Sequence, residues 1–133
     1  MKAQATRLEA RGSSSDQLGK YQLIATLGQG GMGTVYLALA SGLGEFRKLL
    51  VLKELRQDLT RQEGFVSLFM DEAKLAARLA HPNVVQTFEA SEVGDRYFLA
   101  MEYLDGQSLS TLLERTSGPE SALLSRAMHI QIL

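Results

Sequence analysis

The 133-residue sequence contains no cysteine and only two histidines. Without cysteine the chain has no disulfide bond and no thiolate metal site, which agrees with a reducing compartment. His81 and His129 are too few for a histidine-rich metal site. No stretch approaches the roughly 18 apolar residues of a membrane span, and the N-terminus lacks the apolar core of a signal peptide. We therefore expect a cytoplasmic protein without a membrane segment.

The sequence also lacks an excess of either charge. Its 14 lysines and arginines nearly balance 15 aspartates and glutamates, and the formal net charge is −1. This mixture has no electrostatic footprint for nucleic acid or an anionic membrane, so any phosphate contact must be local. The 45% apolar content and the length fit one globular domain with a hydrophobic core. Residues 1–18 are polar and serine-rich, and we expect a mobile tail there.

Glycine, by contrast, is concentrated in one short stretch. Residues 28–36 read GQGGMGTVY, with four glycines in six positions. YQLIATL precedes the cluster, and TVYLALA follows it with apolar residues at every second position, which is typical of strands. The pattern predicts a glycine-rich tip that joins two antiparallel strands. Such a tip either covers phosphates, because glycine allows backbone N–H groups to approach them closely, or is an ordinary turn.

Two other glycine-rich nucleotide sites fit less well. A P-loop requires Lys and then Ser or Thr after its last glycine, but Gly33 is followed by Thr34 and Val35. A dinucleotide-binding fold requires a helix after its GxGxxG motif. Residues 34–39 have strand patterning, and a strand at these positions would eliminate this alternative.

The remaining chain alternates between strand and helix patterns. Helical spacing is expected over residues 62–80, ended by the proline of His81–Pro82. The other expected elements are a strand at 46–55, a strand pair at 84–90 and 95–104 turned around Gly94, and helices at 108–115 and 120–133.

Lys53 lies inside the apolar strand LLVLKEL, where an unpaired charge is costly. In one interpretation its side chain reaches water from an edge strand. In the other it pairs with a carboxylate of the following helix. Glu72 is the best candidate, because it shares a helix face with Leu75 and Leu79 that we expect to point toward the sheet.

The motifs GQGGMGTVY, VLKEL, MDEAKLAARLAHPNVV and FLAMEYLDGQSL, in this order, resemble the amino-terminal lobe of protein kinases. They are most similar to bacterial serine/threonine kinases of the eukaryotic-like type. The resemblance implies an α+β fold with a five-stranded antiparallel sheet and one main helix. It implies a tail at 1–18, the lobe with its hinge at 19–106, and the start of a helical second lobe at 107–133.

The resemblance also implies a nucleotide site. Lys53 would contact the α and β phosphates of ATP and pair with Glu72. In the hinge, residues 102–104, the backbone carbonyl of Glu102 and the N–H of Leu104 would bond the adenine. Val51 departs from the alanine that is usual in the family. The implied nucleotide-binding residues are Leu27, Gly28, Gly30, Gly33, Val35, Val51, Lys53, Met101, Glu102 and Leu104.

The catalytic loop and the metal-binding aspartate of a kinase are missing from this sequence. The only asparagine is Asn83, within the HPN triplet at 81–83, so no HRDxxxxN motif exists. We expect this chain alone to be inactive, and Mg²⁺ and a protein substrate to require the second lobe. An alternative is a non-catalytic interaction module. In either case the apolar last helix at 120–133 is expected to need a covering partner.

Overall fold

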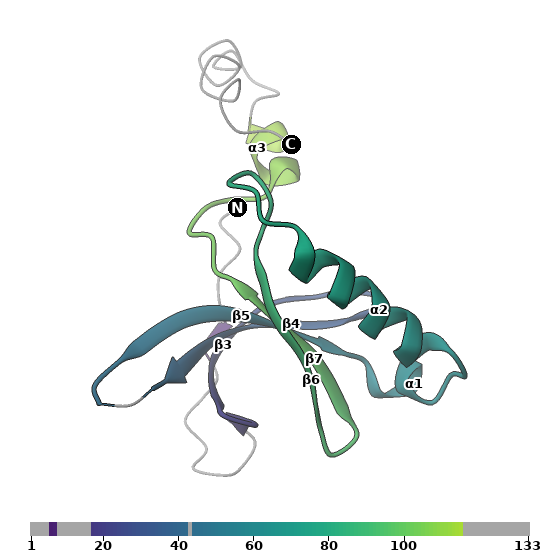
Figure 1. Ribbon diagram of the computed structural model, residues 1–133. Coiled ribbons are helices and arrows are strands. Elements are labelled where there is room, and N and C mark those ends of the chain that lie inside the picture. The colour runs from purple at the N-terminus through teal and green to yellow at the C-terminus, as the bar shows by residue number, and fades with distance from the viewer. Residues whose placement is uncertain (1–5, 8–16, 43, 116–133) are drawn as a thin grey trace.

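The computed structural model describes residues 6–7, 17–42 and 44–115, which form one antiparallel sheet and three helices (Figure 1). The strand order is β1-β3-β4-β5-β7-β6, and β2 also pairs with β3. The strands are β1 (Thr6–Arg7), β2 (Gln17–Leu18), β3 (Tyr21–Gln29), β4 (Gly33–Ser41), β5 (Arg47–Leu55), β6 (Thr87–Val93) and β7 (Arg96–Glu102). Five of the seven strands are long and correspond to the five predicted ones.

The predicted glycine-rich hairpin is confirmed. β3 and β4 are antiparallel from the pair Tyr21 and Ala40 to the pair Gln29 and Thr34, next to the tip. Alternating apolar side chains in both segments favour this pairing because one face of each strand becomes buried. Residues 34–39 are strand, so the alternative of a dinucleotide-binding fold is eliminated.

The main core lies on one face of this sheet. Leu52, Ala38 and Ala100 are fully buried there, together with Phe98, whose ring meets the ring of Tyr21 edge-on at a centroid distance of 5.8 Å. Burial of each large apolar side chain contributes about 1.5–3 kcal/mol to folding. The other core members are Leu18, Leu23 and Leu50.

Leu18 shows that the ordered lobe begins before the predicted boundary at residue 19. Its side chain is completely buried, and its short strand pairs with the start of β3. Thr6–Arg7 also pairs with β3. Part of the segment predicted as a tail therefore extends the sheet.

The helical segments are α1 (Gln57–Thr60), α2 (Phe65–Arg78) and α3 (Leu109–Arg115). The single helix predicted over 62–80 begins later than expected because Gly64 precedes it with φ +80°, a conformation that a helix interior does not contain. Leu79 is extended, so α2 ends at Arg78, before the predicted end at residue 80. The short helix α1 was not predicted.

The orientation of α2 differs from the expectation at two positions. Phe69 and Ala73 are its buried residues, whereas Leu75 and Leu79 are 63% and 55% exposed. The prediction that Leu75 and Leu79 point toward the sheet is therefore wrong. Among the described elements α2 packs mainly against β6, which selects the Phe69 side of the helix for burial.

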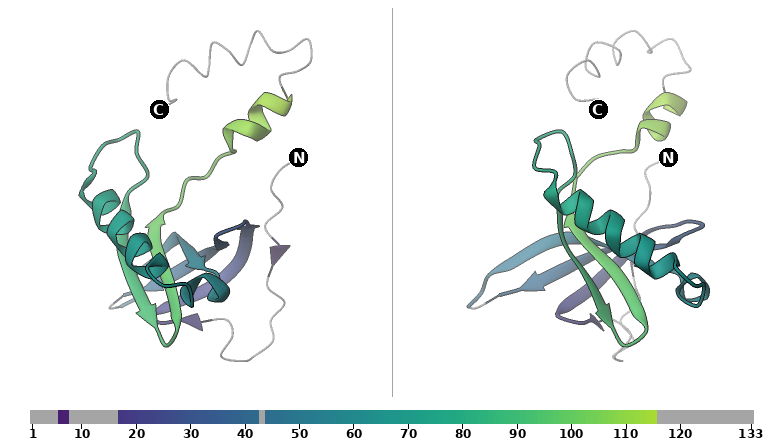
Figure 2. Two further views of the ribbon diagram at one scale, coloured as in Figure 1. Left: turned by 90° about the vertical axis from the view of Figure 1, so that its right-hand side faces the viewer. Right: turned by 45° about the vertical axis from the view of Figure 1, so that its right-hand side comes forward.

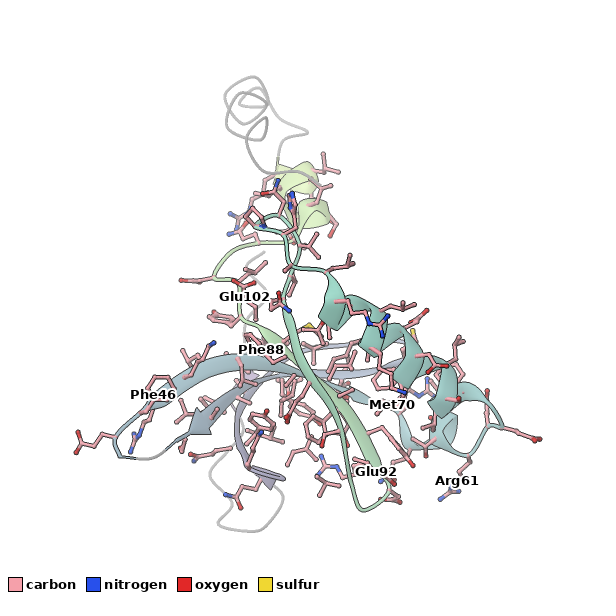
Figure 3. The ribbon with its side chains drawn as sticks, in the orientation of Figure 1. Phe46, Arg61, Met70, Phe88, Glu92 and Glu102 are labelled. Carbon is pink, nitrogen blue, oxygen red and sulfur yellow. The ribbon has the colours of Figure 1, made fainter. Side chains whose placement is uncertain are left out.

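The end of the described chain leaves the sheet after β7. Figure 2 shows α3 separated from the sheet by the extended segment that follows Glu102, and Figure 3 labels Glu102 at this point of departure. The Oγ of Ser108 accepts a hydrogen bond from the N–H of Thr111 at 3.3 Å, which fits an N-cap at the start of α3. The predicted helix at 120–133, and with it His129, lies outside the described residues.

Candidate nucleotide site

The tip of the β3–β4 hairpin is a tight turn, in which the N–H of Gly30 donates to the carbonyl of Gly33 at 2.9 Å. None of its glycines has the positive φ that favours glycine. A Cβ added at Gly28 or Gly30 would meet no atom within 4 Å. The space beside these two residues is thus open to a ligand.

Gly33 differs from these two glycines. A Cβ at this position would lie 1.7 Å from the carbonyl oxygen of Glu54, so β4 approaches β5 too closely for any side chain. The predicted role of Gly33 in covering phosphates therefore adds to a packing requirement that the sequence did not reveal.

The register of the sheet brings four of the predicted site residues together. Val35 pairs with Lys53, and Lys53 pairs on its other side with Leu99. Val51 pairs with Met101 in the same ladder. Because residues two apart and residues paired across strands share a face, these five side chains lie on one face of the sheet. This is the face opposite the main core.

The structure does not join Lys53 to Glu72. Within the described residues no ion pair links them, Lys53 is half-buried, and Glu72 is exposed on α2. Asp71, the acidic residue next to Glu72 in sequence, pairs with Lys74 at 3.7 Å. Glu72 was the expected partner because Leu75 was expected to face the sheet, and the side chain of Leu75 is exposed instead.

The sequence did not reveal the ion pair between Glu54 and Arg96, in which Glu54 lies on the face of β5 opposite Lys53. The Nε of Arg96 donates to Oε1 of Glu54 at 2.6 Å, and its Nη2 donates to Oε2 at 2.9 Å. The side chains of Glu54 and Arg96 are only 12% and 28% exposed. The hydrogen bond to Glu54 raises the pKa of Arg96, although burial opposes this. The pKa of Tyr36 is raised mainly by burial and, to a smaller extent, by the negative charge of Glu54.

The ion pair of Glu54 with Arg96 links β5 to β7 at the residue that follows Lys53. Glu54 and Lys53 are neighbours in sequence, so their side chains occupy opposite faces of β5. The signal in the sequence was Glu54, the second charged residue of VLKEL, because a largely buried carboxylate needs a charged partner. The partner is 42 residues away and could not be chosen from spacing.

The hinge residues are held by the segment before β6. The N–H of Glu102 donates to the carbonyl of Gln86 at 2.9 Å, and the carboxylate of Glu102 accepts the N–H of Gln86 at 3.3 Å. No hydrogen-bond partner within the described part of the chain takes the N–H of Leu104. This group is available to an acceptor such as an adenine nitrogen.

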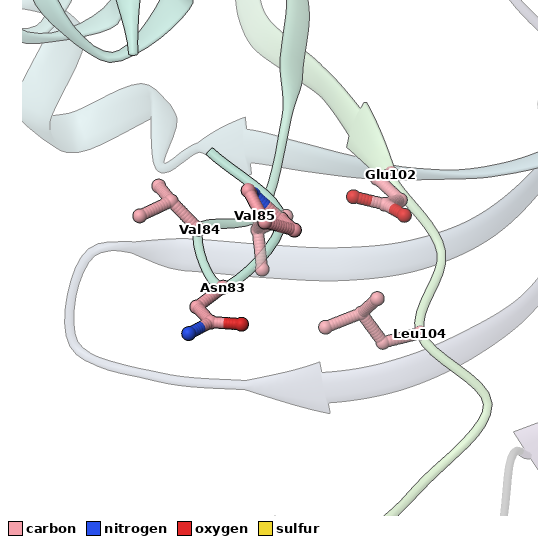
Figure 4. A pocket seen from close by; sticks show the side chains of 6 residues that line it. Asn83, Val84, Val85, Glu102 and Leu104 are labelled. Atoms are coloured by element: carbon pink, nitrogen blue, oxygen red, sulfur yellow. The ribbon is translucent and has the colours of Figure 1, made fainter. Parts of the chain in front are cut away.

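A small pocket opens between the hinge and the HPN segment (Figure 4). Its volume is about 160 Å³, below the range of about 300–1,000 Å³ that is usual for ligand sites. Pro82, Asn83, Val84, Val85, Glu102 and Leu104 line it. The pocket therefore does not coincide with the predicted nucleotide site, with which it shares only Glu102 and Leu104.

His81 organises the turn beside this pocket. Its Nδ1 accepts the N–H of Asn83 at 3.1 Å, and its carbonyl accepts the N–H of Val84 at 3.0 Å. These bonds agree with a structural role after α2. Within residues 6–7, 17–42 and 44–115 no cluster of His, Asp or Glu is arranged to hold a metal ion. No helix in these ranges combines the length and apolar character of a membrane span.

Known proteins resemble this chain in both sequence and fold. The protein kinase domain family matches residues 21–133. Tyrosine-protein kinase MasK of Myxococcus xanthus is 43% identical over 95 residues, which cover 71% of this chain and 15% of that protein. Serine/threonine-protein kinase pkn3 of the same organism is 42% identical over 97 residues, or 72% of this chain and 17% of pkn3.

The PknI kinase domain of Mycobacterium tuberculosis has a similar structure. It superposes with a TM-score of 0.65 and 28% identity over 77% of this chain and 40% of that domain. This chain thus spans less than a fifth of these two curated relatives and less than half of the solved kinase domain. With the kinase-like lobe and the family match over most of its length, the chain belongs to the protein kinase family.

Proposed function

We propose that this chain is the ATP-binding lobe of a serine/threonine protein kinase. The observation that carries the proposal is the joint placement of the open glycine tip and Lys53. Val35, which follows the tip, pairs with Gly28 on one side and with Lys53 on the other, so the side chains of Val35 and Lys53 share one face of the sheet in line with Gly28. Gly28 and Gly30 leave open space beside this hairpin, although neither packing nor φ requires glycine there.

The residues on this face fit the chemical groups of ATP. Lys53 supplies a point charge for phosphate oxygens, and the backbone N–H groups of the glycine tip approach phosphates without a Cβ in the way. The apolar side chains of Leu27, Val35, Val51 and Met101 provide a surface for the adenine ring. The N–H of Leu104 and the carbonyl of Glu102 are proposed as its hydrogen-bonding partners.

In a complete kinase we propose that Lys53 orients the α and β phosphates while the γ-phosphoryl group moves to a serine or threonine hydroxyl. Glu72 is proposed to pair with Lys53 in that state, which requires α2 to turn its Glu72 side toward β5. The kinase family uses ATP with Mg²⁺, and we propose no metal ligand among the described residues. The serine/threonine assignment is supported by the name of pkn3, whereas the name of MasK favours tyrosine.

The test compares two lysines of the same strand. Lys53→Met removes the proposed phosphate contact, and Lys48→Met removes an equal charge from the opposite face of β5, where Lys48 lies 4.3 Å from the ring centre of Phe88. A charged hydrogen bond contributes about 1.5–3 kcal/mol, so Lys53→Met is expected to weaken ATP binding about tenfold to a hundredfold. Titration calorimetry with ATP measures this, and Lys48→Met should bind like the unchanged protein. Equal affinities of all three proteins would contradict the proposal.

A second candidate function, a non-catalytic interaction module, is favoured by the exposed face of α2. Leu68 and Leu75 recur at helical spacing on α2, Leu79 follows directly after its last residue, and all three are more than half exposed. This function requires no nucleotide. It predicts that the unchanged protein gives no ATP signal and that Lys53→Met leaves the binding of a protein partner unchanged.

A further inference from the structure

Arg56 connects the end of β5 to the glycine tip by two hydrogen bonds. Its backbone N–H donates to the carbonyl of Met32 at 2.9 Å, and its Nη1 donates to the carbonyl of Gly31 at 3.1 Å. The residue lies three positions after Lys53, at the start of the segment that leads into α1. The two carbonyls belong to successive residues of the tip, so a single arginine contacts both.

Asp58 fixes the direction in which Arg56 points. Its Oδ1 accepts Nε at 2.8 Å and its Oδ2 accepts Nη2 at 2.5 Å, which is a two-pronged arginine–carboxylate pair. The guanidinium is planar and rigid, so once two of its nitrogens are held by Asp58 the third is directed at Gly31. The hydrogen bond from Arg56 lowers the pKa of Asp58, because it stabilises the charged carboxylate.

The direction of the tip carbonyls determines the direction of the tip N–H groups. In a trans peptide the carbonyl and the N–H of the next residue point to opposite sides, and the described chain contains no cis peptide. When the carbonyls of Gly31 and Met32 point to Arg56, the N–H groups of Met32 and Gly33 point away from it. Within the described chain the N–H of Met32 has no hydrogen-bond acceptor.

We propose that Arg56 is a positioning residue that turns the N–H groups of Met32 and Gly33 toward bound phosphate. This inference rests on the proposed function, since it concerns the same glycine-rich loop. Arg56 acts through the backbone of the tip and is not itself assigned a contact with the nucleotide. The pair with Asp58 is exposed on both sides, so its contribution to overall folding is small and its effect is local.

The test measures the affinities of the 133-residue protein for ATP and for adenosine. Arg56→Ala is expected to weaken ATP binding about threefold to tenfold, the effect of the one lost side-chain hydrogen bond to Gly31, and to leave adenosine binding unchanged. Arg61→Ala is the matched control, because Arg61 is an exposed arginine in the turn between α1 and α2 (Figure 3), and no hydrogen bond or ion pair joins its side chain to the tip within the described residues. Arg56→Lys is expected to recover part of the loss, since one donor can still reach Gly31.

A second measurement separates positioning from direct contact. In the ligand-free protein, Arg56→Ala is expected to shift the backbone amide resonances of Met32 and Gly33, whereas Arg61→Ala is not. Unchanged resonances together with weaker ATP binding would mean that Arg56 touches the nucleotide, and the positioning role would be wrong. Equal losses for ATP and adenosine would overturn it as well, because they indicate general damage to the site.

Failure of this inference is distinguishable from failure of the proposed function. If the unchanged protein prefers ATP to adenosine and Arg56→Ala retains that preference, only the role of Arg56 is wrong. If the unchanged protein has no preference for ATP, the phosphate role of the whole loop is wrong and the inference is overturned with it.

Discussion

Replacing Gly33 with alanine is expected to destabilise the sheet by about 3 kcal/mol. The new Cβ would lie 1.7 Å from the carbonyl oxygen of Glu54 and 2.8 Å from its carbonyl carbon, and both are backbone atoms that no rotamer change can move. Real Cβ atoms stay at least 3.0 Å from such neighbours, so β4 must move away from β5 by about 1.3 Å. The same movement stretches the 2.9 Å hydrogen bond between the N–H of Arg56 and the carbonyl of Met32 beyond its normal range.

The magnitude follows from three contributions. Strain from the inserted methyl group costs about 1–3 kcal/mol, and each disrupted backbone hydrogen bond costs about 0.5–1.5 kcal/mol. Alanine also restricts the unfolded chain more than glycine, which offsets about 0.4–1 kcal/mol. Urea denaturation followed by circular dichroism measures the free energy of unfolding directly.

Gly28→Ala and Gly30→Ala are the matched controls for Gly33→Ala. Neither position has a neighbour within 4 Å of a new Cβ, and neither has positive φ. Both variants are expected to keep the unfolding free energy or gain up to about 1 kcal/mol, while ATP binding weakens. If Gly33→Ala unfolded at the same urea concentration as the unchanged protein, the close approach of β4 to β5 would be refuted.

Two further predictions concern charged groups of the lobe. Arg96→Met is expected to cost about 2 kcal/mol in urea denaturation, because it leaves the largely buried carboxylate of Glu54 without its charged donor, and adding Glu54→Gln should restore part of the loss. Burial disfavours the charged form of Glu89, but its hydrogen bonds from Tyr21 at 2.7 Å and Lys20 at 3.1 Å outweigh burial and lower its pKa. A carboxylate with a lowered folded-state pKa stabilises the protein above its unfolded pKa of about 4.5, so unfolding free energy should fall as the pH drops below that value, and less steeply in Tyr21→Phe.

Each of these predictions has an outcome that contradicts it. If Glu54→Gln changed the free energy of unfolding by the same amount in the Arg96→Met protein as in the unchanged protein, the two side chains would not be energetically coupled. Parallel acid-denaturation curves for the unchanged protein and Tyr21→Phe would mean that the bond to Glu89 does not set its pKa.

The strand and turn predictions succeeded where the signal was local. Alternating apolar residues on both sides of the glycine cluster specified the β3–β4 hairpin, since period two allows only one face of each strand to be buried. The turn at Gly94 was equally local, and its φ of +63° is readily accessible only to glycine. The start of α2 was placed too early because a helical pattern continues through Gly64, whose backbone does not.

The face of α2 could not be predicted from its sequence. Phe69 and Ala73 define one apolar stripe, while Leu75 and Leu79 belong to another that overlaps it. Both stripes satisfy helical spacing equally, so the pattern leaves the rotation of the helix open. Packing against β6 selected the stripe with Phe69, and this also turned Glu72 toward solvent.

The sequence by itself therefore determined the order of the five long strands and the main helix, the glycine-rich hairpin and the kinase family, because period, turn residues and motif spacing are local properties of the chain. Only the tertiary structure decided which strands approach too closely for a side chain at Gly33. It also chose Arg96 as the partner of Glu54 and placed Arg56 against the glycine tip. The contacts of Arg56 with Gly31 and of Arg96 with Glu54 join residues 25 and 42 positions apart, and their distances depend on how the sheet closes, which no local pattern contains.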